Sequence, residues 1–229
     1  MTKQTSRRWL LRGLGAGAVT TLAGCMGNLT NDASGDADGP KGDRQAAEKP
    51  GAAESSLLAS PALGSANAPV TIEAYTDYMC GHCSTFHLQT LPRVEDKYLS
   101  TGDVYYVHRD FPIPLSEWSW NAAMAGRSVQ ANEGMDAFFA FTEGAYEEQA
   151  DMSWSAIERV ARRVGADAKR VVADAKDGAY RSTVDADRQS GIDRGVRGTP
   201  TFFVNGKELV PEKSWWYTVD TGLQAALKE

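Results

Sequence analysis

Two cysteines three positions apart, in Cys80-Gly81-His82-Cys83, are the residues of this sequence best suited to chemistry. A thiolate attacks disulfides and a thiol does not, so a reactive cysteine needs surroundings that stabilise negative charge. The alternation in Val70 to Tyr75 predicts a strand, and a helix is expected from about Gly81 to Leu99, kinked near Pro92. Cys80 would then lie where free N–H groups and the helix dipole favour an anion, and a protonated His82 would add positive charge.

Cys83 follows one helical turn later and should be more buried, which suits it to be the resolving thiol. Cys80 would form a mixed disulfide with a client protein, and Cys83 would displace the client sulfur. The motif alone leaves redox chemistry, half a zinc site and a structural pair open. A zinc site needs about four ligands, whereas the only other cysteine is Cys25 and the sequence holds only 3 histidines. We therefore expect neither a metal site nor a cofactor.

The chain opens with Ser6-Arg7-Arg8-Trp9-Leu10-Leu11, continues with the weakly apolar stretch Gly13 to Thr21, and reaches Leu22-Ala23-Gly24-Cys25. This order resembles a twin-arginine export signal that ends in a lipobox, with a basic end for the cytoplasmic side and small residues for the signal peptidase. The resemblance implies that residues 1–24 are a signal peptide. It also implies that a lipid on Cys25 anchors the exported chain to the outer face of the cytoplasmic membrane.

Residues 25–62 are rich in Gly, Ala, Asp and Ser and show no apolar periodicity, which predicts a flexible, lipid-anchored linker. The folded domain is expected to span residues 63–229. The sequence as a whole is 42% hydrophobic and 24% charged, as is typical of globular proteins. Its formal net charge is −6, and removal of the basic signal would make it more acidic, so nucleic acid is not an expected partner.

The remaining elements follow from patterning. Val104 to Val107 predicts a second strand, and the order strand, helix, strand favours parallel pairing with a right-handed crossover. The stretch from about Leu115 to Arg194 is expected to be helical, with Ser155 and Glu158 spaced for a capping box. Its aromatic residues are assigned to the core: Trp118, Trp120, Phe138, Phe139 and Phe141. Asn205-Gly206 predicts a two-residue hairpin turn, and a last helix is expected from about Ser214 to Leu227.

Three segments together resemble the DsbA-like family of thioredoxin-fold proteins. They are Asp77-Tyr78-Met79-Cys80-Gly81-His82-Cys83, His108-Arg109-Asp110-Phe111-Pro112, and the run from Gly195 through Thr199-Pro200 to Gly206. The resemblance covers the chain from about Pro69 to the C-terminus. It implies an α/β, thioredoxin-like fold with an inserted helical domain at about residues 115–194.

The resemblance also assigns further site residues. Pro200 matches the family's cis proline, and the backbone of Thr199 would be the docking edge for an extended client peptide by strand addition. The family commonly holds a buried acid six residues before the first cysteine, as proton acceptor for the resolving thiol, but that position is Ala74 here. Glu73 should face the other side of the strand. Asp77 matches the family motif and could serve in proton transfer or as a helix cap.

The leading expectation is an extracytoplasmic thiol–disulfide oxidoreductase that forms disulfides in exported client proteins and exchanges electrons with a membrane redox partner. A reductase or isomerase with the same site is the alternative, because the direction of electron flow depends on thiolate stabilisation in the folded state. An alternative of another class is a tethered lipoprotein that binds metal or peptide.

Overall fold

The computed structural model describes residues 57–114 and 116–229. The predicted signal peptide (1–24), the anchor residue Cys25 and the predicted linker as far as residue 56 lie outside the described residues. No helix in the described ranges is long and apolar enough to cross a membrane.

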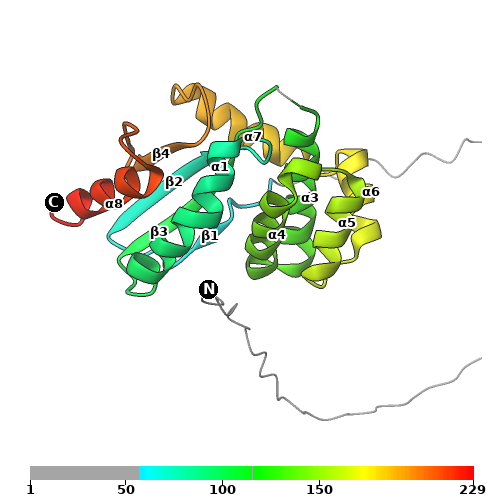
Figure 1. The fold of residues 1–229 in the computed structure, drawn as a ribbon, viewed down its shortest axis with the longest axis horizontal. Helices are drawn as coiled ribbons and strands as arrows, with labels where there is room; N and C mark the ends of the chain where they lie inside the picture. Colours follow the sequence, from blue (N-terminus) through cyan, green and yellow to red (C-terminus); the bar gives the residue numbers. More distant parts are fainter. Residues whose placement is uncertain (1–56, 115) are drawn as a thin grey trace, which may run out of the picture. The chain divides into compact units, whose positions relative to one another are not determined.

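A five-stranded mixed sheet forms the centre of the described domain (Figure 1). Its strands are β1 (Ala62–Leu63), β2 (Val70–Thr76), β3 (Val104–Asp110), β4 (Thr201–Val204) and β5 (Lys207–Glu208), in the order β1-β3-β2-β4-β5. β2 and β3 are parallel, as the strand, helix, strand order predicted, and the other neighbours are antiparallel. The turn between β4 and β5 has positive φ at Asn205 (45°) and Gly206 (82°), which confirms the predicted hairpin.

The crossover between β2 and β3 is one continuous helical run, which we call the cysteine helix. It consists of α1 (Gly81–Thr85), the π-helical η1 (Phe86–Thr90), α2 (Leu91–Val94) and the π-helical η2 (Glu95–Leu99). The kink expected near Pro92 takes the form of a change in register, because the Leu91 N–H donates to the carbonyl of Phe86 just before Pro92, which has no N–H.

The cysteine helix and α8 (Trp215–Ala226) cover one face of the sheet (Figure 1). Even-numbered residues of β2 face them, and this core includes Ile72, Ala74, Phe86 and Phe202. Ser214 caps α8 by accepting from the Tyr217 N–H, so the last helix begins where the sequence predicted. The layer of helix on sheet holds the helix start, and therefore both cysteines, at the end of β2.

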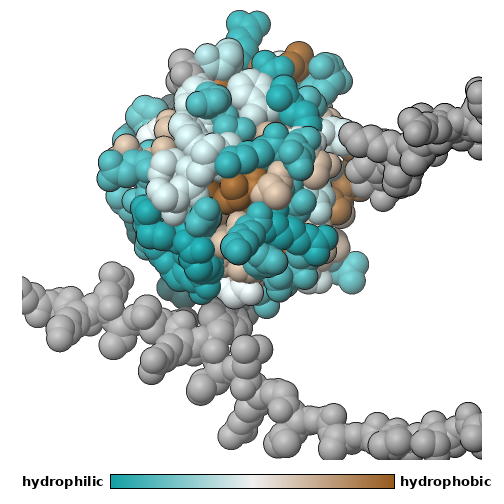
Figure 2. Space-filling model, turned by 90° about the vertical axis from the view of Figure 1, so that its right-hand side faces the viewer, coloured by the Kyte–Doolittle hydropathy of each residue, from teal (hydrophilic) through white to brown (hydrophobic). Residues whose placement is uncertain are grey.

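The segment between β3 and β4 is helical, which confirms the predicted insertion (Figure 1). It contains α3 (Trp118–Glu133), α4 (Met135–Glu147), the 3-10 turn η3 (Gln149–Asp151), α5 (Trp154–Arg163), α6 (Ala168–Asp177) and α7 (Arg181–Asp193). α7 also packs on the second face of the sheet, where a Cβ on Gly191 would lie 2.6 Å from the Phe111 ring. Figure 2 views the domain from the right-hand side of Figure 1 and shows a mixed face, on which hydrophilic residues surround a small hydrophobic patch.

Two details of the helical segment differ from expectation. α5 is capped by Ser153, whose hydroxyl accepts from the Ala156 N–H, so the capping box predicted at Ser155 is wrong by two residues. Phe138 and Phe141 are fully buried, whereas Trp118 and Trp120 are half-buried and pack against the core. Only Ser155 has the Glu three residues later that a capping box requires, whereas Ser153 is followed at that distance by Ala156. The fold nevertheless places Ser153 just outside the first turn.

The domain begins earlier than the predicted boundary at residue 63. The Leu58 N–H donates to Thr183 Oγ1 at 3.2 Å, and the Ala59 carbonyl accepts from Gln130 Nε2 at 2.8 Å. The carbonyl of Pro61 accepts from the His108 N–H at 2.8 Å. These bonds use mostly backbone atoms, so nothing in the composition of this stretch separates it from the linker that precedes it.

A buried charge cluster joins β3 to α3 and α7. Arg127 is fully buried, and its guanidinium donates to Asp110 Oδ2 (Nε to Oδ2 2.6 Å) and to Asp187. His108 Nε2 lies 3.1 Å from Asp110 Oδ1. On the other face of the sheet Glu73 accepts from Arg109 and Arg194, as expected for its position in the strand.

Candidate active site

Cys80 and Cys83 are both free and lie at the start of the cysteine helix. Cys80 occupies the N-cap position in an extended conformation (φ −86°, ψ 117°), and among the described residues no side chain caps the helix there. Its sulfur is half-buried and lies 3.1 Å from the carbonyl oxygen of Thr199, to which the thiol donates. The sulfur therefore lies in front of the unpaired N–H groups of the first helical turn.

The surroundings of Cys80 lower its pKa to about 5. The largest contribution is a hydrogen bond from Cys83, which outweighs the opposing effect of burial, and the Thr199 side chain adds to it. The backbone N–H groups of Cys83 and His82 contribute the rest. Cys80 is thus mostly thiolate at neutral pH, the form that attacks disulfides and that leaves readily from them.

Cys83 lies in the opposite environment. It is fully buried, and burial, together with the hydrogen bond to Cys80 and the charge on Cys80, raises its pKa well above the usual value. The Asp77 backbone N–H approaches its sulfur at 3.5 Å. Cys83 is therefore a thiol at rest, closed to solvent, next to a sulfur that is charged.

Asp77 holds the turn before the helix. Its Oδ1 accepts from the Met79 N–H at 2.6 Å and from Ser119 Oγ at 2.9 Å, and its Oδ2 accepts from the Ile113 N–H at 2.6 Å. None of these donors belongs to α1, so Asp77 is not the cap of that helix. Burial raises the pKa of Asp77, against the effect of these three bonds. Its carboxylate ties the active-site turn to the loop after β3 and to α3.

His82 points away from the interior. Its side chain is exposed, and its ring meets Trp215 edge-on with centroids 6.0 Å apart. The contribution of His82 to the Cys80 thiolate that the structure shows comes from its backbone N–H. The effect of a charged imidazole on Cys80 stays a prediction.

The Thr199-Pro200 bond is cis, as the resemblance implied. Thr199 presents its carbonyl to Cys80, and its hydroxyl has no bonded partner among the described residues in the thiol form. β4 begins two residues after Thr199, at Thr201. Of the two residues named from the sequence as a docking edge, Thr199 therefore lies beside the reactive sulfur, and Pro200 connects it to the start of β4.

Gln149 is a site residue that the sequence did not reveal. It comes from η3 of the helical insertion, and its Nε2 donates to the carbonyls of Tyr78 (2.6 Å) and Cys80 (3.1 Å). No motif surrounds it and it lies 69 positions from Cys80, so only the fold brings it to the active-site turn. Gln149 holds the backbone on either side of Met79.

Two histidines are buried in the core, His87 in the cysteine helix and His108 on β3. His87 stacks on Tyr146 with ring centroids 4.5 Å apart, and His108 lies 5.7 Å from His87 between centroids. His108 is the register partner of Ala74 in the parallel pair of β2 and β3. His108 belongs to one of the three segments that resemble the DsbA-like family, whereas no motif in the sequence marks His87.

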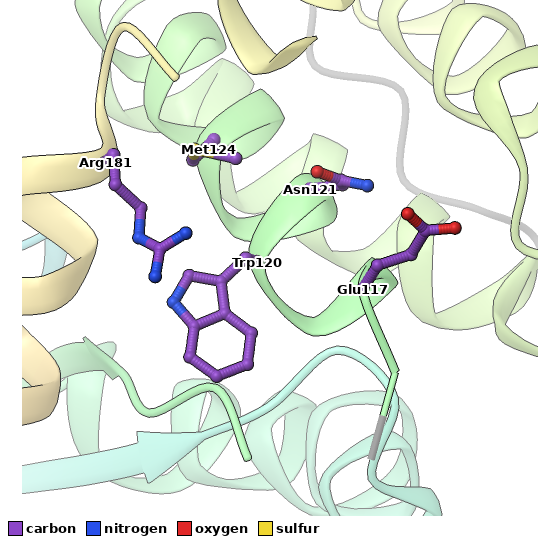
Figure 3. A pocket seen from close by; sticks show the side chains of 5 residues that line it. All are labelled: Glu117, Trp120, Asn121, Met124 and Arg181. Atoms are coloured by element: carbon purple, nitrogen blue, oxygen red, sulfur yellow. The ribbon is translucent and has the colours of Figure 1, made fainter. Parts of the chain in front are cut away.

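No group of three or more His, Cys, Asp or Glu side chains that could hold a metal ion occurs in the described part of the chain. A shallow hollow of ≈ 200 Å³ lies elsewhere, along α3, and is lined by Glu117, Trp120, Asn121, Met124 and Arg181 (Figure 3). The Arg181 guanidinium faces the Trp120 ring, 5.1 Å from its centroid. Neither cysteine lines this hollow, so we do not assign the chemistry to it.

Comparison with known proteins agrees with this geometry. A family model described as thioredoxin matches residues 56–221. The chain belongs to this thioredoxin family. The disulfide bond formation protein D of Bacillus subtilis (strain 168) is 26% identical over 162 residues, which cover 67% of this chain and 71% of that protein. With the free cysteine pair at the helix start, this member of the thioredoxin family is an extracytoplasmic thiol–disulfide oxidoreductase of the DsbA-like type.

Solved structures show the same fold for this thioredoxin-family chain. The crystal structure of oxidised BdbD from Bacillus subtilis superposes with a TM-score of 0.68 at 22% identity and covers 74% of this chain and 94% of that one. The thiol-disulfide exchange protein alpha-DsbA2 from Wolbachia pipientis superposes with a TM-score of 0.62 at 23% identity, covering 72% and 86%. The thioredoxin-like fold with a helical insertion, expected from the sequence, is confirmed.

Proposed function

We propose that this oxidoreductase forms disulfide bonds in exported proteins, with Cys80 as the sulfur that bonds to the client and Cys83 as the resolving thiol. The observation that carries the proposal is the difference between the two sulfurs, because the pKa of Cys80 is lowered to about 5 while that of Cys83 is raised. A stabilised thiolate stabilises the reduced protein, which makes the disulfide a stronger oxidant. The similarity to a protein named for disulfide bond formation supports the same direction.

The proposed cycle begins with the Cys80–Cys83 disulfide. A client thiolate attacks the Cys80 sulfur, and Cys83 leaves with the electron pair of the broken bond. A second client thiolate then attacks the client sulfur of the mixed disulfide and expels the Cys80 thiolate. The client gains one disulfide and the enzyme gains two electrons. In reoxidation the Cys80 thiolate would attack a disulfide of a membrane redox partner, and Cys83 would resolve this mixed disulfide, so that the Cys80–Cys83 bond is restored and the two electrons pass to the partner.

Client docking would use the edge next to Cys80. An extended client segment would pair with the backbone of Thr199, in front of Pro200, by strand addition. The position of the Thr199 carbonyl 3.1 Å from the Cys80 sulfur supports this role, because a peptide bound there would bring its own cysteine to the reactive atom. Pairing between backbones depends little on the client's side chains, which suits an enzyme that acts on many client proteins.

Export and anchoring complete the proposal, although they depend on residues outside the described ranges. Arg7 and Arg8 would direct twin-arginine export, and a lipid on Cys25 would hold the domain at the outer face of the cytoplasmic membrane. Changing both arginines to lysine should leave precursor in the cytoplasm, and Cys25→Ala should release the exported protein from the membrane. Normal membrane attachment of the Cys25→Ala protein would contradict the lipid anchor.

The redox state in living cells tests the direction of electron flow. Rapid acid quench, alkylation of free thiols and a mass-shift gel would report the fraction of protein with Cys80 and Cys83 joined. We expect Cys80 and Cys83 to be joined in most of the protein, because an oxidase is in its disulfide form before it reacts with a client. A mostly reduced pool would contradict the proposal and indicate a reductase or isomerase.

A further inference from the structure

The burial of Cys83 poses a question about protons. In every exchange cycle Cys83 alternates between a thiol and a disulfide, so its sulfur must lose or gain a proton at a place closed to water. The nearby carboxylate of Asp77 already accepts three hydrogen bonds. Ala74, on the face of β2 below the cysteine helix, offers no proton acceptor.

His87 is placed to meet this need. It follows Cys83 by four residues in the cysteine helix, so the two side chains leave the helix on the same side. Its ring stacks on Tyr146, whose hydroxyl donates to the Asp77 carbonyl at 3.3 Å. Burial, and then a charge on Cys83, raises the pKa of Tyr146, so this stack lies within electrostatic reach of the Cys83 sulfur.

One ring nitrogen of His87 makes no hydrogen bond to the described residues. Nε2 is buried and has no hydrogen-bond partner in the described part of the chain, although buried polar atoms nearly always have one. Burial, and then His108, lowers the pKa of His87 well below its usual value, and Asp110 acts in the opposite direction. His87 is therefore neutral at rest and has a free lone pair or a free N–H in the core.

His108 completes the pair from the sheet. It lies directly across from Ala74 in the β2–β3 register, on the face that the cysteine helix covers. Its Nε2 lies 3.1 Å from Asp110 Oδ1, and its buried Nδ1 has no partner among the described residues. Arg127 in turn donates to Asp110. A positive charge that formed on His87 would meet this fixed carboxylate through the His108 ring, which lies 5.7 Å away between centroids.

We propose that His87 takes up the proton of Cys83 as that thiol attacks the mixed disulfide, and that His108, fixed by Asp110, stabilises the imidazolium that forms. The new bond is Cys83 to Cys80, the broken bond is Cys80 to client, and the client sulfur leaves with its electron pair. The proton passes from Cys83 to His87 and then to bulk water before the next turnover. In the opposite direction His87 delivers a proton to Cys83 as it leaves.

Two features make this transfer feasible. The charge on Cys80 that helps to raise the pKa of Cys83 is absent while Cys80 is held in a mixed disulfide. The thiolate and imidazolium also form together, so each is stabilised by the other in a medium of low dielectric constant. The other titratable groups packed around the pair are Tyr78, Tyr106 and Tyr146, which burial keeps neutral, and the Asp110–Arg127 ion pair.

The test follows the two half-reactions separately. Reduced full-length protein is mixed with oxidised glutathione, quenched with acid at timed intervals, and analysed by mass spectrometry for the glutathione adduct on Cys80. Formation of the adduct reports attack by Cys80, and its decay reports attack by Cys83. The inference rests on Cys83 being the resolving thiol, so an adduct that decays equally fast in a Cys83→Ala protein would overturn that assignment and the role of His87 with it. Slow decay in Cys83→Ala together with unchanged decay in His87→Gln would overturn the role of His87 alone.

For His87→Gln we expect adduct formation at the normal rate and adduct decay slowed about 100-fold at pH 7, the usual effect of losing a general base. Decay in this variant should also rise about tenfold per pH unit, because hydroxide replaces the lost base, whereas the wild-type rate stays level from pH 6 to 8. Phe86→Leu is the matched control, since it disturbs packing beside His87 without removing a titratable group.

Equal decay rates and equal pH profiles in His87→Gln and Phe86→Leu would overturn the proposal. Should His87→Gln fail to fold, the wild-type profile still decides, because adduct decay that rises about tenfold per unit from pH 6 to 8 would show that no internal base serves Cys83. His108→Gln provides a second variant, with the same change in profile expected at a smaller amplitude.

Discussion

The two sulfurs of the active site lie one helical turn apart and have opposite surroundings. Cys80 lies at the surface, where hydrogen-bond donors from the backbone, Thr199 and Cys83 stabilise a thiolate. Cys83 lies in the core, where burial and the hydrogen bond to Cys80 raise its pKa against the effect of the Asp77 N–H and the Thr199 side chain. A helix that starts at the end of a central strand passes from solvent into the core within its first turn, so two identical residues three positions apart acquire different chemistry.

The arrangement of supporting residues repeats this contrast. The surface side is held by residues brought from the helical insertion and from the loop before β4, namely Gln149 and Thr199. The interior side is held by the buried histidines and by the Asp110–Arg127–Asp187 cluster. Changes on the surface side should therefore alter reactivity and leave the fold intact, whereas changes on the interior side should also lower stability.

Replacing each of the two cysteines in turn by alanine gives the largest expected effect. Cys80→Ala should abolish disulfide exchange and form few or no client adducts, because the remaining thiol is buried. Cys83→Ala should accumulate client adducts that appear as high-mass bands on a non-reducing gel and vanish on reduction, because nothing inside the protein can resolve them. Adducts trapped equally by both variants, or by neither, would refute the difference between the sulfurs.

Arg127→Met should give the next largest effect, on stability. The change leaves the carboxylates of Asp110 and Asp187 buried without their main partner, and breaking a buried pair in this way typically costs about 3 to 5 kcal/mol. Urea denaturation of the reduced protein would measure the free energy of unfolding. Arg159→Met removes a pair with Glu148 on the surface and should change that free energy far less.

Gln149→Leu should have a small effect, confined to the surface side. Loss of the donor to the carbonyls of Tyr78 and Cys80 should raise the pKa of Cys80 by less than about one unit, since a single hydrogen bond contributes about 1 kcal/mol. The pH dependence of iodoacetamide modification would show the shift. Gln189→Leu removes an amide that donates to Asp193 on α7 and should leave the Cys80 profile unchanged.

Local patterns predicted what depends on local sequence. The Cys80–Cys83 pair at a helix start, the hairpin at Asn205-Gly206 and the last helix all follow from residues close together in the chain, and the structure has them. Gln149 could not be predicted in this way, because its partners are two backbone carbonyls far away in sequence.

The burial of individual side chains is the second property that could not be predicted from the sequence. His87 has the spacing of an ordinary helix residue, and only the packing of α4 against the cysteine helix, through Tyr146, makes it a core histidine with an uncommitted nitrogen. The start of the domain was predicted too late for a related reason, because Leu58 and Ala59 are held mainly by their backbone groups.

The most direct test of the difference between the sulfurs is the alkylation of each cysteine as a function of pH. Reduced protein would be treated with iodoacetamide for short times from pH 3 to 9, and the modified residue would be identified by peptide mass spectrometry. We predict that Cys80 is modified with a midpoint near the pKa of about 5 and that Cys83 stays unmodified while the protein is folded. Modification of both cysteines with a common midpoint above pH 8, or faster modification of Cys83, would contradict the account.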